Sequence, residues 1–498
     1  MLTNSTPMSI DPSQPIPLYF QLRTLLLEEI IGGRYGPGER LPTEHELCDH
    51  YRISRTPVSR ALSELAEEGV ILRQRRRGTF VNPHWLRRRE DQPEVRVVVS
   101  EGPWGDLVLG AAPDDIQLSV VTVPLTSLHQ VLTHAVAEGQ APDLAILDSV
   151  WIAEFAVDGF LHGLEDLNER WVRDELESDF LEPLVATNRY AGRTYGVSPL
   201  ANVAGLWYRR RELETLGLEP PTTWAQLRAV GRTAREIGIP HPIVITGGSK
   251  GGETTAYCLV AFLASNGAQV LSTDGITLDS RGTAQALRFL RSLVDDGLMS
   301  SEVVVYEWTR PIRLLAEGKA VISFGGSYEA RTVAEGLGVP LDELWDHVGF
   351  MPVPAGPGGS PASVAGTMSY GIFRQAPQPR LAMRLLESAV SPAALARAAR
   401  ATGRIPARRS AVALATPDHR FLSQTAEMLE RAVTRPTTPL YPRVSTQLQT
   451  MLEAVLTGRL GAAAAGRHTA ELLGAITGLP VLHEVDLLAP AAAAAAAG

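Results

Sequence analysis

Hydrophobic positions near the start of the chain recur with the period of a helix. From Leu18 to Ile30 the apolar residues form one stripe, and the glycine pair 32–33 ends the predicted helix. Further along, Thr43 and Glu46 have the spacing of a capping box, in which each side chain bonds the backbone N–H group of the other residue. The pattern therefore predicts a second, short helix that begins directly after Thr43.

A third predicted helix is followed at once by a hairpin. Thr56 precedes Pro57, which predicts Thr56 as the N-cap and Pro57 as the first helical residue, and Gly69 ends the helix. The short apolar runs 70–72 and 79–81 flank an arginine-rich segment and predict a hairpin with a positively charged tip. Three helices and a hairpin occur in many small structural domains, but this order with a basic tip is typical of a winged helix-turn-helix that binds DNA.

The pattern changes in the rest of the chain, where apolar runs and helical stripes alternate. Strands are predicted at 95–99, 118–123 and 144–147, and helices at 126–139 and 151–159. This alternation predicts an α/β segment with a mostly parallel sheet, and the segment is long enough for two lobes. Ligands of such sheets bind in a crevice beyond the strand ends.

Charge is distributed unevenly between these two parts. The chain has 498 residues and a net charge of −9, yet residues 1–90 hold 13 Arg against 11 Asp and Glu. Arginines are concentrated at 73–77 and at 87–89, and such basic clusters on an acidic protein indicate a confined surface for a polyanion. For residues 87–89 a solvated linker is an equal alternative.

Several classes of protein are not supported by the sequence. The start is polar, and no apolar run is long enough to cross a bilayer, so we expect a cytoplasmic protein without a membrane segment. Cys48 and Cys258 form no metal or disulfide pattern, and the glycine-rich stretch 247–252 is not a Walker A loop. That stretch is either a loop at a cleft or a surface loop. We expect no enzyme activity, no cofactor and no metal.

The first part of the chain resembles a known family of regulators. Residues 17–21 (PLYFQ), 38–44 (GERLPTE), 54–62 (SRTPVSRAL) and 69–81 closely resemble the DNA-binding domain of GntR-family regulators. The resemblance extends over residues 15–82 and implies that Ser54, Arg55 and Thr56 open the recognition helix, with Arg55 as a guanine contact. It also implies homodimers that bind double-stranded operator DNA.

The predicted DNA contacts come from the resemblance and from the basic hairpin. They are Thr43, His45, Ser54, Arg55, Thr56, Ser59, Arg60, Arg75, Arg76, Arg77, Gly78 and Thr79. Thr43 and Thr79 are predicted neighbours of phosphate groups, and the arginines of the hairpin neutralise phosphate charge. His45 and Ser59 stand where several family members have Arg, so the operator sequence cannot be transferred from them.

The remaining segment resembles family 1 extracellular solute-binding proteins, the group that includes maltose-binding proteins. The resemblance rests on short patterns in the right order: 142–161, 192–208, 220–224 (PPTTW), 318–328, 352–354 and 403–408. It implies two α/β lobes that close on a small molecule, most often an oligosaccharide, and it implies that Trp224 is structural. Between Val99 and Leu118 the usual first helix is shortened.

Sugars are bound by aromatic rings and by converging polar groups, which guides the choice of ligand contacts. Position by position, the resemblance implies Asp148, Ser149, Trp151, Asn202, Tyr257 and Tyr328, and location alone adds Trp104 and Trp308. Core packing is the alternative for each aromatic residue.

The predicted fold is multidomain, an α+β winged helix-turn-helix followed by a two-lobed α/β domain of the periplasmic-binding-protein type (type II). Its predicted parts are a tail (1–14), the DNA-binding domain (15–83), a basic linker (84–93), the ligand-sensing domain (94–488) and an alanine-rich tail (489–498). Within the sensing domain, lobe I spans about 94–200 and 366–403, and lobe II about 201–365 and 404–488.

Together these features predict a regulator, expected to be a repressor, whose sensing domain binds a sugar and thereby controls operator binding. Three alternatives stay open. The second part could be an aminotransferase-like domain with pyridoxal phosphate, although Lys250 and Lys319 are the only lysines. The same fold could sense a polyamine, an amino-acid derivative or a sugar phosphate. It could also serve only as a dimerisation scaffold.

Overall fold

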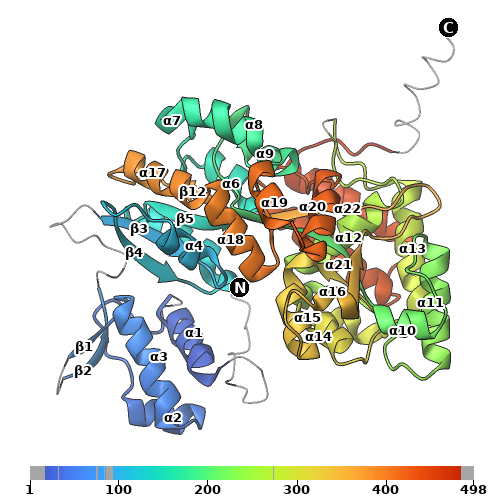
Figure 1. Ribbon diagram of the computed structural model, residues 1–498, viewed down its shortest axis with the longest axis horizontal. Helices are drawn as coiled ribbons and strands as arrows, with labels where there is room; N and C mark the ends of the chain where they lie inside the picture. Colours follow the sequence, from blue (N-terminus) through green and yellow to red (C-terminus); the bar gives the residue numbers. More distant parts are fainter. Residues whose placement is uncertain are drawn as a thin grey trace. The chain divides into compact units, whose positions relative to one another are not determined.

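The computed structural model describes residues 10, 17–31, 33–74, 77–83, 85, 94–272 and 274–483. It divides the chain into two compact units (Figure 1). The first contains residues 1–147, 159–168 and 370–389, and the second contains 148–158, 169–369 and 390–498. Each unit is described by itself.

The first unit begins with three helices and a two-stranded hairpin. The helices are α1 (Leu18–Ile31), α2 (Glu44–Tyr51) and α3 (Arg55–Glu67), and the strands are β1 (Ile71–Gln74) and β2 (Gly78–Val81). The strands pair antiparallel, with Arg73 opposite Thr79. We call this part, residues 18–81, the head. The order of its elements confirms the predicted winged helix-turn-helix.

Two predictions concern the N-terminal ends of α2 and α3. The capping box is confirmed, because the backbone N–H of Thr43 donates to Glu46 at 2.7 Å and the N–H of Glu46 donates to the Thr43 hydroxyl at 3.3 Å. The prediction of Thr56 as the N-cap of the third helix is wrong, because α3 begins at Arg55 and Ser54 is its N-cap. Pro57 fits inside the first turn because the first N–H groups of a helix have no intrahelical partner.

The rest of the first unit is a parallel α/β layer. Its strands are β3 (Glu94–Val99), β4 (Gln117–Thr122) and β5 (Leu144–Asp148), and its helices include α4 (Trp104–Gly110), α5 (Leu125–Ala137) and α17 (Pro379–Ala389). The strand β3 is central and pairs in parallel with β4 on one side and β5 on the other. Val97 and Val98 are buried, as the continuous apolar run predicted. The helix α4 has seven residues, and its shortening relative to the family stays a prediction.

The second unit is built around the long strand β8. This strand (Leu200–Arg209) pairs antiparallel with β10 (Ile322–Gly326), β11 (Val348–Met351), β13 (Ile405–Pro406) and the start of β12 (Ala365–Ile372), and β9 (Ile243–Val244) pairs in parallel with β10. Nine consecutive residues of β8 are buried. Two short strands, β6 (Arg189–Tyr190) and β7 (Arg193–Thr194), form a separate hairpin.

Most of the helices belong to the second unit, and α7 begins in the first (Figure 1). They are α6 (Ile152–Val157), α7 (Glu165–Trp171), α8 (Glu177–Asp179), α9 (Glu182–Thr187), α10 (Arg210–Thr215), α11 (Trp224–Glu236), α12 (Glu253–Ala264), α13 (Arg281–Asp295), α14 (Arg310–Ala316), α15 (Ala330–Leu337), α16 (Leu344–His347), α18 (Pro392–Thr402), α19 (Arg409–Ala415), α20 (Arg420–Glu430), α21 (Tyr441–Leu456) and α22 (Ala462–Thr477). Short turns of other helix types are η1 (Ser149–Trp151), η2 (Val172–Leu176), η3 (Ser249–Gly251), η4 (Ser301–Val305) and η5 (Ser327–Glu329). Trp224 stacks on Phe289 with ring centroids 4.6 Å apart, which confirms its structural role.

The units are divided differently from the predicted lobes. Residues 148–158, 169–200, 366–369 and 390–403 are predicted for lobe I, and the structure groups them with the second unit. The physical reason is a network at Arg408, whose Nε donates to Asp179 at 2.7 Å and whose Nη2 donates to Glu175 at 3.0 Å. These bonds join the helices before β8 to the chain that follows β13.

Candidate functional site

The surface of the head that is predicted to read DNA is formed by the starts of α2 and α3 and by the hairpin. Ser54, Arg55 and Thr56 are all exposed at the N-terminal end of α3. The Nε of Arg55 lies 2.9 Å from Oε2 of Glu44 on α2, and Arg73 on β1 lies 2.5 Å from the other oxygen of Glu44. Hydrogen bonds from these arginines lower the pKa of Glu44, so its carboxylate holds the two cations on one face.

The other predicted DNA contacts have different surroundings. Thr43 and His45 are exposed, Ser59 is half-buried, and Arg60 lies 3.7 Å from the ring centroid of Tyr19 and 3.0 Å from Glu64. In the hairpin Arg77 is exposed, while Gly78 and Thr79 are half-buried; Arg75 and Arg76 fall outside the described residues. Gly78 has φ +117°, a conformation that favours glycine, so the hairpin turn depends on it. These DNA contacts stay predictions.

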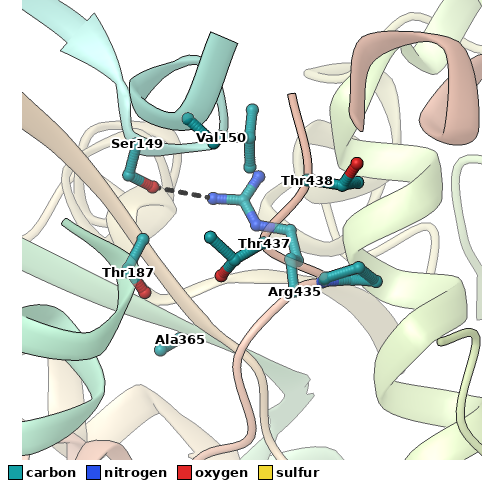
Figure 2. A pocket seen from close by; sticks show the side chains of 9 residues that line it. Ser149, Val150, Thr187, Ala365, Arg435, Thr437 and Thr438 are labelled. Carbon is teal, nitrogen blue, oxygen red and sulfur yellow. Dashed lines mark hydrogen bonds between the residues drawn. The ribbon is translucent and has the colours of Figure 1, made fainter. Parts of the chain in front are cut away.

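In the second unit Arg435 lines a small pocket of about 10 Å³, which in this conformation has room for about one water molecule. Its lining residues are Ser149, Val150, Ala153, Thr187, Ala365, Arg435, Pro436, Thr437 and Thr438. Figure 2 shows the guanidinium of Arg435 pointing toward Ser149, with the hydroxyl groups of Thr187 and Thr437 on the same side. The Nη2 of Arg435 lies 3.4 Å from Oγ of Ser149 and 3.5 Å from Oδ1 of Asp148. A buried cation and the Ser149 hydroxyl therefore meet at a pocket that threonine side chains also line.

The charge of Arg435 is balanced by carboxylates on two other segments. Its Nη1 donates to Oε1 of Glu253 at 2.8 Å, and the same oxygen accepts from the hydroxyl of Tyr441 at 2.8 Å. Burial alone would lower the pKa of Arg435, but Asp148 and Glu253 raise it, so the guanidinium stays charged. Burial raises the pKa of Asp148, against the attraction of Arg435. One buried cation therefore lies between two carboxyl groups.

Two further predicted ligand residues belong to the same network. The hydroxyl of Tyr257 on α12 donates to Oδ1 of Asn202 at 2.9 Å and to the carbonyl of Val364 at 3.0 Å. The guanidinium of Arg435 lies 5.4 Å from the ring centroid of Tyr257. Burial raises the pKa of Tyr257 well above its usual range, so its hydroxyl keeps the proton that it donates. Asp148, Ser149 and Tyr257 thus lie around Arg435, and Asn202 is joined to them through the Tyr257 hydroxyl.

Thr254, on the same helix as Tyr257, contacts one member of an aromatic pair. The ring centroids of Trp308 and Tyr328 lie 6.1 Å apart, and the hydroxyl of Tyr328 lies 3.1 Å from that of Thr254 on α12. Trp308 is 49% exposed, which leaves its ring open to a ligand. The guanidinium of Arg404 lies 5.9 Å from the Tyr328 ring, and burial lowers the pKa of Arg404 to about 10.

The structure places the last two predicted ligand residues elsewhere. Trp104 lies in the core of the first unit and is 2% exposed, while the hydroxyl of Tyr370 donates to its backbone carbonyl at 2.6 Å. Its side chain therefore has almost no surface that a ligand could reach in this conformation. Trp151 is half-buried in η1. The ligand-binding role of all these residues stays a prediction.

Sequence reasoning missed the residues at the centre of the site. Arg435 and Glu253 are 182 positions apart, and each lies in a stretch with no motif. The one available signal is the glycine-rich stretch 247–252, predicted as a loop at a cleft or a surface loop, which Glu253 directly follows. Lys319, the residue weighed for a Schiff base, is paired with Glu317 at 2.7 Å and is half-exposed.

Comparisons with protein-family models assign two regions of the chain. Residues 108–396 match the model of bacterial extracellular solute-binding proteins, and residues 18–81 match that of bacterial regulatory proteins of the gntR family. A putative binding protein of Brucella abortus is 26% identical over 307 residues, which are 60% of this chain and 72% of that protein. A probable fructoselysine utilization operon transcriptional repressor of Escherichia coli is 44% identical over 64 residues, 13% of this chain and 26% of that protein.

Solved structures show the same fold for the larger part of the chain. A solute-binding protein of Thermotoga lettingae, bound with α-D-tagatose, has a TM-score of 0.69 and 22% identity, and covers 78% of this chain and 100% of its own. Maltose-bound MalE3 of T. maritima has a TM-score of 0.66 and 25% identity, and covers 76% of this chain and 99% of its own. This fold overturns the aminotransferase-like alternative. None of the helices in the described ranges has the length and apolar character needed to cross a bilayer.

Proposed function

We propose that this chain, which belongs to the family of bacterial extracellular solute-binding proteins and carries a gntR-family region at residues 18–81, is a DNA-binding regulator. In this proposal a small sugar controls it. The head binds double-stranded operator DNA, and the solute-binding part senses the effector. Because operator DNA is the partner, we place its action in the cytoplasm. A homodimer fits the two half-sites that helix-turn-helix proteins read.

The observation that carries the effector class is the Arg435 site. Asp148 and Ser149 contact Arg435 there, and Tyr257 lies beside it with its hydroxyl bonded to Asn202. Thr254, the residue after Glu253, bonds Tyr328, which pairs with the exposed ring of Trp308. Hydroxyl groups of a sugar need polar partners that replace water, and its apolar face stacks on rings. Arg435, Asp148 and Glu253 carry one positive and two negative charges when both carboxyl groups are ionised, and this set disfavours an anionic solute. The sugars named for the two structural neighbours support the same class.

Relief of repression is the sign of control that we favour. It is supported by the repressor named among the relatives of the head. Sugar binding would close the solute-binding part and change the affinity of the head for its operator, which requires only a difference in sugar affinity between the two states. The other solutes and the scaffold role remain as alternatives for the same fold.

The direct test is thermal unfolding of the purified chain against mono- and oligosaccharides, with amino acids and polyamines as controls. A ligand that binds the native state raises the unfolding temperature by mass action. A shift with one sugar class, lost in Trp308→Ala, is the expected result. A shift with a polyamine or an amino acid would replace the effector class, and no shift in the whole panel would favour the scaffold.

A second measurement tests the DNA-binding half. The chain is used to select duplexes from a randomised library, and binding of the enriched duplex is compared with binding of a scrambled one by fluorescence anisotropy. We expect a specificity ratio of about 10³ or more at physiological salt. A ratio near one would contradict a role as an operator-binding regulator.

A further inference from the structure

The first helix of the head is buried on faces that point in opposite directions. Leu22 and Leu26 are fully buried on one face, and Thr24 and Leu27, which helical spacing places on the other side, are 8% and 0% exposed. A helix on the surface of a small domain normally keeps one polar face toward water. A helix that is buried all round needs a second packing partner besides the core of its own domain.

The first unit supplies this second partner. The helix α1 packs against α3 within the head and also against α5, which follows strand β4 of the α/β layer. The hydroxyl of Thr126 on α5 donates to Glu28 on α1 at 3.3 Å. The contact therefore joins the head directly to the first α/β layer within the same unit.

Arg23 connects both sides of this contact. Its side chain is 3% exposed, and its Nη2 lies 2.7 Å from both carboxylate oxygens of Glu68, the residue that caps the C-terminal end of α3. The same nitrogen donates to the carbonyl of Thr122, the last residue of β4, at 2.8 Å. One buried cation thus bonds the end of the predicted recognition helix to the end of a strand of the sensing part.

The contact of Arg23 with Thr122 lies at the carboxyl end of a strand. Thr122 ends β4, and Glu101, which follows β3, accepts from the backbone N–H of Leu125 at 2.9 Å. Ligands of parallel α/β sheets bind beyond the carboxyl ends of the strands. The head is therefore attached at the carboxyl edge of the sheet, the edge at which ligands of such sheets bind.

We propose that α1, fixed by Arg23, is the docking element through which the sensing part sets the state of the DNA-binding head. The proposal rests on the proposed function. Thr122 and α5 move with the loops at the strand ends, and Arg23 passes that movement to Glu68 and the end of α3. Coupling of this kind is reciprocal, so DNA bound to the head changes the strand end as well.

Hydrogen–deuterium exchange of the full chain tests the docking without any effector. In Arg23→Gln we expect exchange over residues 120–128 to become roughly tenfold faster, because a buried charge-assisted bond across the contact is lost. Arg34→Gln is the matched control, since Arg34 pairs with Glu29 inside the head. An unchanged rate at 120–128, with faster exchange only in α1 and α3, would overturn the docking.

A residue of α5 on the other side of the contact offers a second variant if Arg23→Gln does not fold. Thr126→Val keeps the shape of the side chain and removes the bond to Glu28, and we expect roughly twofold to threefold faster exchange over residues 24–31. Equal exchange in Thr126→Val and the wild type would count against the contact.

The transmission step is tested with the duplex enriched from the randomised library. Its binding should change exchange at 120–128 in the wild type and in Arg34→Gln, and should leave it unchanged in Arg23→Gln. The same change in all three proteins would overturn the role of Arg23. If no duplex is enriched, the proposed function fails, whereas the exchange of the free variants still decides the docking.

Discussion

The Nη1 atom of Arg435 lies 2.8 Å from Oε1 of Glu253, although the two residues are 182 positions apart. The side chain of Arg435 is 7% exposed, and that of Glu253 is 30% exposed. This pair fixes the chain before α21 to the first turn of α12, and α12 also carries Thr254 and Tyr257. The geometry of the proposed effector site therefore depends on one buried ion pair.

Loss of Arg435 is expected to destabilise the second unit. In Arg435→Met the carboxylates of Asp148 and Glu253 lose their buried partner, which costs about 3–5 kcal/mol of the free energy of unfolding. Urea denaturation followed by tryptophan fluorescence measures the change. The control is Arg170→Met, because Arg170 is exposed and lies 3.4 Å from Asp174, and such pairs contribute about 0–1 kcal/mol. Equal stability of the two variants would show that the Arg435 network is not buried as described.

The exposed ring of Trp308 should matter for binding and not for stability. Because Trp308 is 49% exposed, Trp308→Ala should change the free energy of unfolding by less than about 1 kcal/mol. Loss of the stacking surface should weaken binding of the sugar identified in the thermal panel by about tenfold or more, measured by isothermal titration calorimetry. Trp345→Ala is the control. The ring centroid of Trp345 lies 5.0 Å from the guanidinium carbon of Arg210, outside the site. Equal sugar affinity of Trp308→Ala and the wild type would remove Trp308 from the site.

Local patterns predicted the elements of the head and the strands well, because capping and periodicity act over a few residues. The capping box at Thr43 was confirmed, while the N-cap of α3 was misplaced because Pro is tolerated throughout the first helical turn. The centre of the effector site was not predictable in this way. Arg435, Asp148 and Glu253 meet only through tertiary packing, and no local pattern distinguishes Arg435 from a solvated arginine.

The burial of α1 shows a similar limit. Its sequence predicted one apolar stripe, and Thr24 and Leu27 on the opposite side gave no indication of a partner. Only the fold brings α5 against this helix, so the role of Arg23 could not be inferred from its position between Leu22 and Thr24. The sequence indicates a gntR-like region and a solute-binding-protein-like region. The structure adds the contact of α1 with α5 and β4 in the first unit.

Arg55 is expected to determine base preference in DNA binding. It is exposed at the start of α3 and held by Glu44 at 2.9 Å. Arg55→Ala should weaken binding of the selected duplex by about 1–3 kcal/mol and relax the preference at one base pair. Anisotropy titrations against single-base variants of the duplex measure both effects. Arg34→Ala, which removes an exposed charge from the head, should keep the preference; a similar loss of preference in both variants would contradict base reading by Arg55.

The turn of the hairpin should tolerate no side chain at Gly78. This residue has φ +117°, where an L-amino acid is strained, so Gly78→Ala should lower the stability of the head by about 1–2 kcal/mol. Gly110→Ala is the control, because a Cβ atom at that position meets nothing within 4 Å. Exchange rates in the hairpin and affinity for the selected duplex report the effect. An Ala variant with wild-type exchange over residues 77–83 would contradict the strained turn.

A buried carboxyl group beside the aromatic pair makes stability depend on pH. Burial raises the pKa of Glu329 from its ordinary value of 4.5 to about 8, although the N–H of Gly326 donates to it at 3.1 Å. The folded state therefore keeps a proton that the unfolded state has lost. The stabilisation from this group is fully present below about pH 4.5 and is lost as the pH rises through about 8.

Replacement of Glu329 by Gln isolates this contribution. The variant keeps a neutral side chain of similar shape, so its free energy of unfolding should fall less steeply with pH than that of the wild type. The slopes should differ by on the order of 1 kcal/mol per pH unit within the window from about 4.5 to about 8. Urea denaturation across that window, with Glu317→Gln as an exposed control, gives the two slopes. Parallel curves for wild type and Glu329→Gln would mean that Glu329 is ionised in the folded protein, which requires water or a cation at its carboxylate.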